Sequence, residues 1–133
     1  MKPSASNIFK KTITAIASAV IVNIIFIFIV KFFVHPPSTF SPFWYSLVAL
    51  YTALGVAGAG VVYWIVTKYT SAYNRVFTWI SIGTLLLSLI PDVGIYTNPG
   101  PDDIGATIPI VIILMLTHVF AAYISVKKLT KEE

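Results

Sequence analysis

Cysteine is absent from the 133-residue chain, and charged residues make up only 11% of it. The first absence excludes disulfides, thiolate metal sites and cysteine nucleophiles. The second excludes an ordinary water-soluble domain, because such a domain carries about a quarter charged residues. Apolar residues reach 57%, and the mean hydropathy is +0.87. The composition therefore predicts that lipid, rather than water, covers most of the folded chain.

Motifs that carry chemistry are also missing. The sequence has no Ser-His-Asp set, no glycine-rich phosphate loop, no histidine cluster, no arginine ladder and no filter-like loop. We therefore expect no catalytic residue, no metal site, no cofactor and no enzymatic activity. The basic residues stand in small groups beside apolar runs and form no stripe with interleaved aromatics, which argues against nucleic-acid binding.

Long apolar runs dominate the rest of the sequence. A helix needs about 20 apolar residues to cross a bilayer, whereas a membrane strand needs about 9–11 and alternates polar with apolar residues. These runs are too long and too uniformly apolar for strands. We predict an all-α fold, a four-transmembrane-helix bundle in a single membrane domain over residues 1–133, with spans at residues 12–34, 43–67, 76–90 and 106–126.

The start of the first span and the end of the third span each allow two interpretations. Lys10 and Lys11 before the first run resemble the start of a signal peptide, but the run is too long for one and no cleavage site follows, so we expect a retained anchor helix. Pro91 and Asp92 are expected to end the third helix and to open a turn-rich outer loop at residues 91–105. No carboxylate would then lie inside a span, whereas proton-coupled small multidrug exporters depend on one.

The distribution of lysine and arginine predicts the orientation. The chain has nine such residues, and all except Lys31 fall on one side if the N-terminus is cytoplasmic. Short loops rich in basic residues stay inside the cell. We therefore expect both termini in the cytoplasm and the acidic loop outside.

Several polar residues are predicted to lie near mid-membrane, where a polar side chain is costly and needs a partner or a purpose. Counting along the helices brings them to one layer. The simpler interpretation is that they hydrogen-bond between helices and fix packing. The alternative is a small binding site or proton relay centred on the histidine, which can titrate near neutral pH. The residues are Asn23, Thr52, Thr84, Thr117 and His118.

Two further groups have competing interpretations. Small residues crowd the second span and favour close helix packing, within the chain or in a homodimer; they are Ala49, Ala53, Gly55, Ala57, Gly58 and Ala59. Three loop aspartates could form an outward cation site, although their spacing matches no calcium loop and simple solvation of the loop is the preferred interpretation; they are Asp92, Asp102 and Asp103.

The C-terminal half resembles a prokaryotic membrane family. The stretch from Leu85 to Asp92 reads LLLSLIPD, and the stretch from Leu114 to Val119 reads LMLTHV. These are similar to motifs of the domain-of-unknown-function family numbered 6069, whose members are four-helix proteins with a Met-His pair in the fourth helix. Thr117 stands here where that pair has methionine. The resemblance implies a bacterial or archaeal plasma membrane and no particular activity.

Two functions are expected from these features. The first is a non-enzymatic membrane module that packs with itself or a membrane protein partner, or holds a small apolar ligand such as a lipid of the bilayer. The alternative is a small transporter or channel that uses the polar layer around Asn23 and His118. A water-lined cavity reaching His118 would favour transport, and a dry, fully packed layer would favour the structural interpretation.

Overall fold

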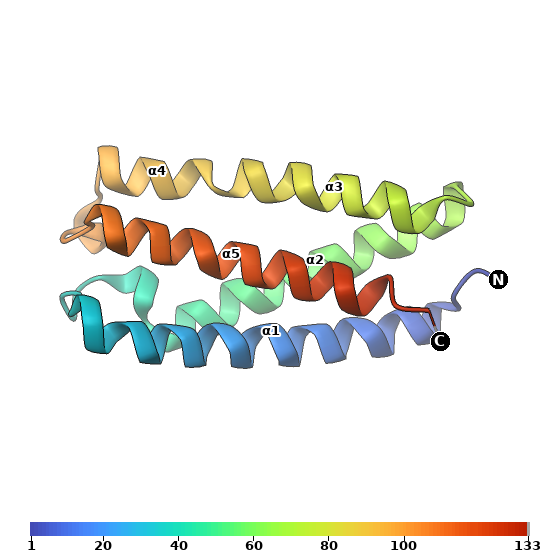
Figure 1. Ribbon diagram of the computed structural model, residues 1–133, viewed down its shortest axis with the longest axis horizontal. Coiled ribbons are helices and arrows are strands. Elements are labelled where there is room, and N and C mark those ends of the chain that lie inside the picture. The colour runs from blue at the N-terminus through green and yellow to red at the C-terminus, as the bar shows by residue number, and fades with distance from the viewer. Residues whose placement is uncertain (133) are drawn as a thin grey trace.

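The computed structural model describes residues 1–132, and its helices lie side by side along one long axis (Figure 1). The predicted all-helical fold is confirmed, and four helical stretches are each long and apolar enough to span a membrane. Two short 3₁₀ turns lie in the connections, η1 (Ser41–Phe43) and η2 (Pro101–Asp103). The α-helices are α1 (Ala5–Val34), α2 (Tyr45–Tyr69), α3 (Tyr73–Ser88), α4 (Ile90–Thr97) and α5 (Ile108–Leu129).

Helix α1 is longer than the apolar run that predicted it. The Ser4 side chain accepts a hydrogen bond from the backbone N–H of Asn7 and so caps a helix that begins at Ala5. At the other end His35 takes a left-handed conformation with φ of 44°, and Pro36 follows. The helix therefore carries Lys10 and Lys11 on its first turns, because capping rather than apolarity sets its start.

The third span does not end at Pro91, so that prediction is wrong. Leu89 joins α3 to α4 and keeps a right-handed helical conformation, with φ of −80° and ψ of −17°. Pro91 lies in the first turn of α4, where a missing backbone N–H costs little. The candidate span runs from Tyr73 to Thr97, and the connecting loop covers only residues 98–107. Asp92 consequently lies on a helix and not in the loop.

Helix α1 packs against both α2 and α5, and these are the most extensive helix contacts of the described chain. Its buried residues fall on one stripe with a mostly four-residue spacing: Ile8, Ala15, Ala19, Asn23 and Ile27. Small side chains on this stripe let the neighbouring backbones approach closely. The closest approach is at Gly60 of α2, where an added Cβ would collide with the side chain of Thr12.

The buried face of α2 is not formed by the small residues that were predicted to pack. Its buried stripe against the bundle includes Val48, Thr52, Val56 and Gly60. The four alanines of the predicted set are half-buried beside this stripe, whereas the two glycines are exposed; the set is Ala49, Ala53, Ala57, Ala59, Gly55 and Gly58. Of the atoms described, no neighbour lies within 4 Å of an added Cβ at either glycine.

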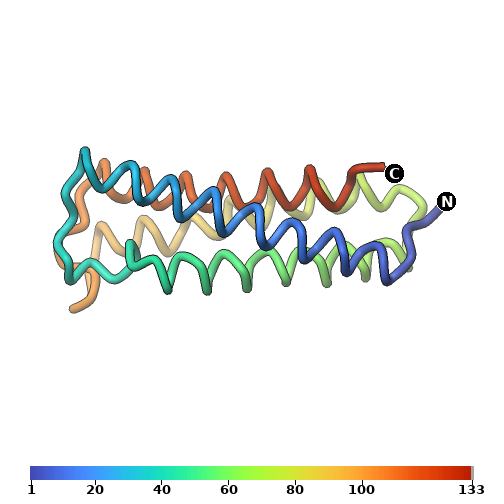
Figure 2. Tube along the Cα trace, turned by 90° about the horizontal axis from the view of Figure 1, so that it is seen from below, coloured from blue at the N-terminus to red at the C-terminus, as the bar shows by residue number. Residues whose placement is uncertain are grey.

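Helix α3 meets α2 near the end of the bundle where both termini lie (Figure 2). The Tyr63 ring of α2 lies edge-on to the Phe77 ring of α3, with centroids 5.0 Å apart. The Tyr63 hydroxyl also donates a 2.8 Å hydrogen bond to Asn74 Oδ1. Phe77 is the one buried residue of α3. Toward the loop end α2 runs beside α1, so α2 and α3 diverge (Figure 1).

The loop end is closed by aromatic rings and by the two 3₁₀ turns. Phe40 and Phe43 are buried, and their rings meet edge-on at 5.1 Å. Gly105 has φ of +100° and lies against Pro37, so a side chain there would be strained and would collide. These contacts hold the connection between α1 and α2 against the connection between α4 and α5.

Candidate functional site

The divergence of α3 from α2 leaves a cleft of about 920 Å³. Helices α2, α3, α4 and α5 supply most of its walls, and α1 contributes only Asn23. The cleft extends from Ser41 and Asp103 near the loop end of the bundle to Phe77, toward the end that contains the termini. Gly55 and Gly58 line it, which explains why these glycines contact no other helix. The lining is mostly apolar, and its polar side chains gather near the middle of the helices.

Asn23 joins three helices beneath the cleft. It is 1% exposed, and its Nδ2 donates to Thr52 Oγ1 at 3.0 Å and to the backbone oxygen of Thr117 at 3.1 Å. The Thr117 hydroxyl donates to the Leu114 carbonyl at 2.6 Å. The structure thus brings Asn23, Thr52 and Thr117 together as the residue count predicts. These bonds fix α1, α2 and α5 relative to one another.

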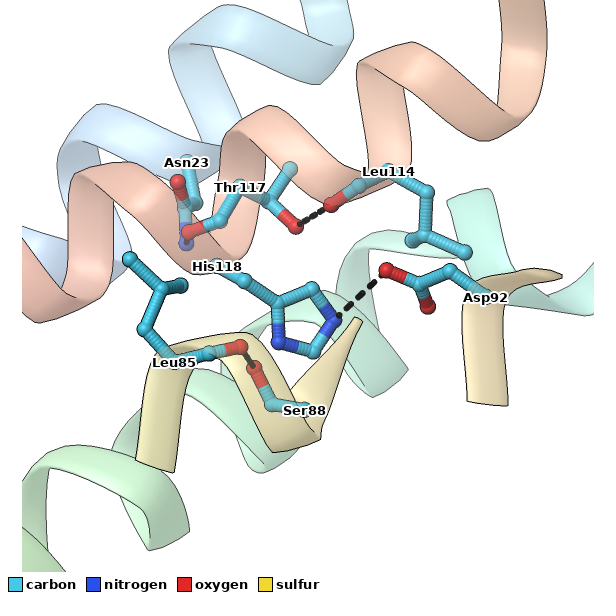
Figure 3. Close-up of polar contacts among 7 residues, drawn as sticks. All are labelled: Asn23, Leu85, Ser88, Asp92, Leu114, Thr117 and His118. Atoms are coloured by element: carbon cyan, nitrogen blue, oxygen red, sulfur yellow. Dashed lines mark hydrogen bonds and ion pairs between the residues drawn. The ribbon is translucent and has the colours of Figure 1, made fainter. Parts of the chain in front are cut away.

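His118 and Asp92 form a second polar group that faces away from Asn23 (Figure 3). His118 Nε2 lies 3.4 Å from Asp92 Oδ2, and the two side chains come from α5 and α4. Asp92 is 3% exposed, whereas the His118 side chain is 36% exposed and lines the cleft. Consecutive residues on a helix point about 100° apart. Thr117 can therefore face α1 and α2 while His118 faces α3 and α4.

The sequence does not predict that Asp92 pairs with His118, because Pro91 indicates a helix end at this point. The signal that could have found it is the order Ile90-Pro91-Asp92. Proline at the first helical positions followed by an acidic residue is typical of a helix start, where the dipole favours a carboxylate. Read in this way, the segment predicts a new helical turn that carries Asp92 back toward the bundle.

The Asp92 carboxylate is incompletely satisfied. The 3.4 Å contact with His118 is within ion-pair range but long for a hydrogen bond, and Oδ2 has no hydrogen-bond partner among residues 1–132. Burying a charged oxygen without hydrogen bonds is costly in an apolar medium. Tyr51 and Asp103 are the other titratable side chains of the described cleft lining, and no lysine or arginine belongs to it. The site therefore has an unused capacity to accept a proton donor or a positive charge.

The remaining predicted residues are placed less centrally. Thr84 lies on the α3 wall of the cleft and is exposed to it. Ser88, on the same wall, donates its hydroxyl to the Leu85 carbonyl at 2.7 Å, so its hydrogen bond is made within α3. Asp103 lines the loop end of the cleft, while Asp102 is exposed outside it. The three aspartates do not gather into the outward cation site, which was the less favoured interpretation of the sequence. Over residues 1–132, no group of three or more His, Cys, Asp or Glu side chains is placed to hold a metal ion.

No protein-family model, curated protein or solved structure matches this chain. The resemblance to the four-helix family therefore stays a prediction, and the functional argument depends on the geometry of the cleft.

Proposed function

We propose that the chain is an integral membrane protein that binds a lipophilic molecule in the cleft between α2 and α3–α4. The observation that carries the proposal is the cleft itself. It has a volume of about 920 Å³ and a largely apolar lining, which is the usual character of a site for a small organic ligand. Its position along the sides of long apolar helices would let a molecule enter from the lipid.

The surface of the helices supports a membrane location. In the most apolar window of the Tyr73–Thr97 span, only 11% of the residues are buried within the molecule. Such a long apolar surface is incompatible with water as the solvent. On the positive-inside argument we place both termini in the cytoplasm of a prokaryotic cell and the loop at residues 98–107 outside its plasma membrane.

A second candidate function, transport of the bound molecule, is favoured by one observation. The cleft reaches the Asp92–His118 pair, which joins α4 to the middle of α5, and extends to Asp103 at the loop end. Contrary to expectation from the sequence alone, a buried carboxylate lies within a candidate span. Intramembrane ionisable residues that face a cavity commonly mark pathways for substrates or protons.

Filling the cleft tests the binding function. Gly55→Phe would place a ring where no atom lies within 4 Å of an added Cβ, on a wall of the cleft. In phosphatidylcholine vesicles that contain a photoactivatable diazirine analogue of hexadecanol, we expect the native chain to be labelled at cleft residues such as Tyr51 and Leu85. The substitution should lower this labelling about tenfold, which corresponds to about 1.4 kcal/mol of binding free energy.

The matched control is Gly83→Phe, because Gly83 also has open space around it but does not line the cleft. That variant should retain native labelling at Tyr51. The exposed Trp79 provides an internal reference for ordinary contact with lipid. Labelling of Tyr51 no stronger than that of Trp79, or unaffected by Gly55→Phe, would show that the cleft holds no ligand.

A further inference from the structure

We propose that the cleft selects lipophilic molecules with a net positive charge, and that the bound cation replaces a proton held by Asp92 and His118. This inference rests on the proposed binding function and adds the chemical class of the ligand. It follows from the charge balance of the described cleft lining, from the geometry of the pair and from the residues that surround it.

Charge balance makes the pair a site for a single positive charge. With one shared proton the pair is neutral overall, either as two uncharged groups or as carboxylate and imidazolium. Without that proton it carries one negative charge, which is costly in an apolar surrounding. No lysine or arginine side chain of residues 1–132 lines the cleft to offset that charge. Lys31, on α1, lies over the Tyr45 ring at 4.1 Å and is not part of the lining.

The geometry leaves the carboxylate available to a ligand. Asp92 is 3% exposed, and its Oδ2 has no hydrogen-bond partner within the described part of the chain. Among the same residues, His118 is the only side chain in ion-pair range, and it is partly exposed to the cleft. A cationic head that approaches along the cleft can therefore reach the carboxylate when the imidazole moves aside. The tyrosine ring of Tyr51, on the opposite wall, offers a face that attracts a cation.

The exchange balances without a covalent step. One cation enters from the lipid, and one proton leaves the pair for water at the loop end of the cleft. The titratable groups that line the cleft around the pair are Tyr51 from α2 and Asp103 from η2, while α1 and α3 contribute none. Asp103 adds negative charge near the exit, which favours departure of a proton and disfavours a phosphate. We therefore commit to a net cationic amphiphile and not to a zwitterionic phospholipid.

Three amphiphiles with the same alkyl chain test this selection. Dodecyltrimethylammonium is a permanent cation, dodecylphosphocholine carries the same ammonium group with a phosphate, and dodecanol is neutral. Each is titrated by calorimetry into the full chain in phosphatidylcholine nanodiscs, and the heat of partitioning into empty nanodiscs is subtracted. We expect the cation to bind about tenfold or more tightly than either of the others. Its affinity should rise with pH by up to about tenfold per unit, because one proton is displaced.

Proton release is measured on the unmodified chain, in weak buffer with a pH indicator, so this result does not depend on a variant. The expected count approaches one proton for each cation bound, and none for dodecanol. Asp92→Asn should abolish the preference for the cation, whereas Asp102→Asn removes an equal charge outside the cleft and should leave the preference unchanged.

The outcomes separate the two proposals. Equal binding of the cation and dodecanol, or binding of the cation without proton release, would overturn the charge selection and leave the lipophilic site intact. A preference for the cation that persists in Asp92→Asn would also overturn it. Failure of all three amphiphiles to bind above the empty nanodiscs would overturn both the charge selection and the proposed binding function.

Discussion

Replacing Gly60 with leucine is expected to disrupt the contact between α1 and α2 and to produce the largest loss of stability of the substitutions considered. An added Cβ at this position collides with Oγ1 and Cγ2 of Thr12 and lies tightly against its Cβ. Thr12 is held in place because its hydroxyl donates a 2.8 Å hydrogen bond to the Ile8 carbonyl and its branched side chain is stiff on a helix. Overpacking of a tight contact costs about 1–3 kcal/mol, and we expect the upper part of this range. Reversible unfolding in mixed micelles would measure it.

Two matched variants isolate this effect. Gly58→Leu introduces the same side chain on the same helix where the space is open, so it should leave the unfolding free energy nearly unchanged. Thr12→Ala removes the two closest of the three atoms and should restore part of the stability lost in Gly60→Leu. Equal losses at positions 58 and 60 would show that α1 and α2 do not meet at Gly60.

Loss of the His118 side chain is expected to destabilise the protein through Asp92. Asp92 is 3% exposed in the native chain, and in His118→Ala its carboxylate loses its ion-pair partner. A hydrogen bond to a charged group contributes about 1.5–3 kcal/mol, which sets the upper limit for this longer contact. We expect the lower part of that range, because the histidine side chain is itself 36% exposed and its contact is 3.4 Å long.

A double-mutant cycle separates this contact from ordinary packing. In the Asp92→Asn background the same histidine substitution should cost clearly less, because no carboxylate remains to be left unpaired. Unfolding free energies of the four proteins give the coupling between the two side chains. A coupling near zero would mean that the two groups are neighbours without an energetic interaction.

The polar layer could be predicted from the sequence, and the Asp92 contact could not. Asn23, Thr52 and Thr117 interrupt long apolar helices at countable depths, so helical geometry alone brings them to one level. Asp92 follows a proline, which looks like a helix end until the neighbouring Leu89 is known to remain helical. Local sequence does not decide between these two conformations, because proline also fits the first turn of a new helix.

The buried face of α2 and the cleft could not be predicted from the sequence, for a different reason. Small residues crowd α2, yet the partner helix decides which face of α2 is buried. The α1 stripe with Ala15 and Ala19 meets Val56, and Thr12 meets Gly60. The cleft depends on how far α3 diverges from α2. The Tyr63 contacts with Phe77 and Asn74 hold the two helices together at one end, and α3 also packs on α5.

These differences change the functional interpretation. Without Asp92 in a span, His118 is a lone histidine whose simplest role is packing. With Asp92 beside it, the histidine is half of a titratable pair that opens onto an apolar cleft. All five polar candidates line the cleft, but they make different contacts. Asn23 bonds to Thr52 and to the backbone of Thr117 and so joins three helices, whereas His118 contacts Asp92 and Thr84 is exposed on the α3 wall.

The helical placement of Asp92 is the point on which the site depends, and the absence of cysteine makes it directly measurable. Single cysteines are introduced as Asp92→Cys and Asp102→Cys, and each chain in vesicles is treated with a membrane-impermeant maleimide. Asp102 is exposed and Asp92 is 3% exposed, so the cysteine at position 102 should react readily and the one at position 92 should be protected. Equal rates of labelling at the two positions would place Asp92 in a solvated loop and would contradict its pairing with His118.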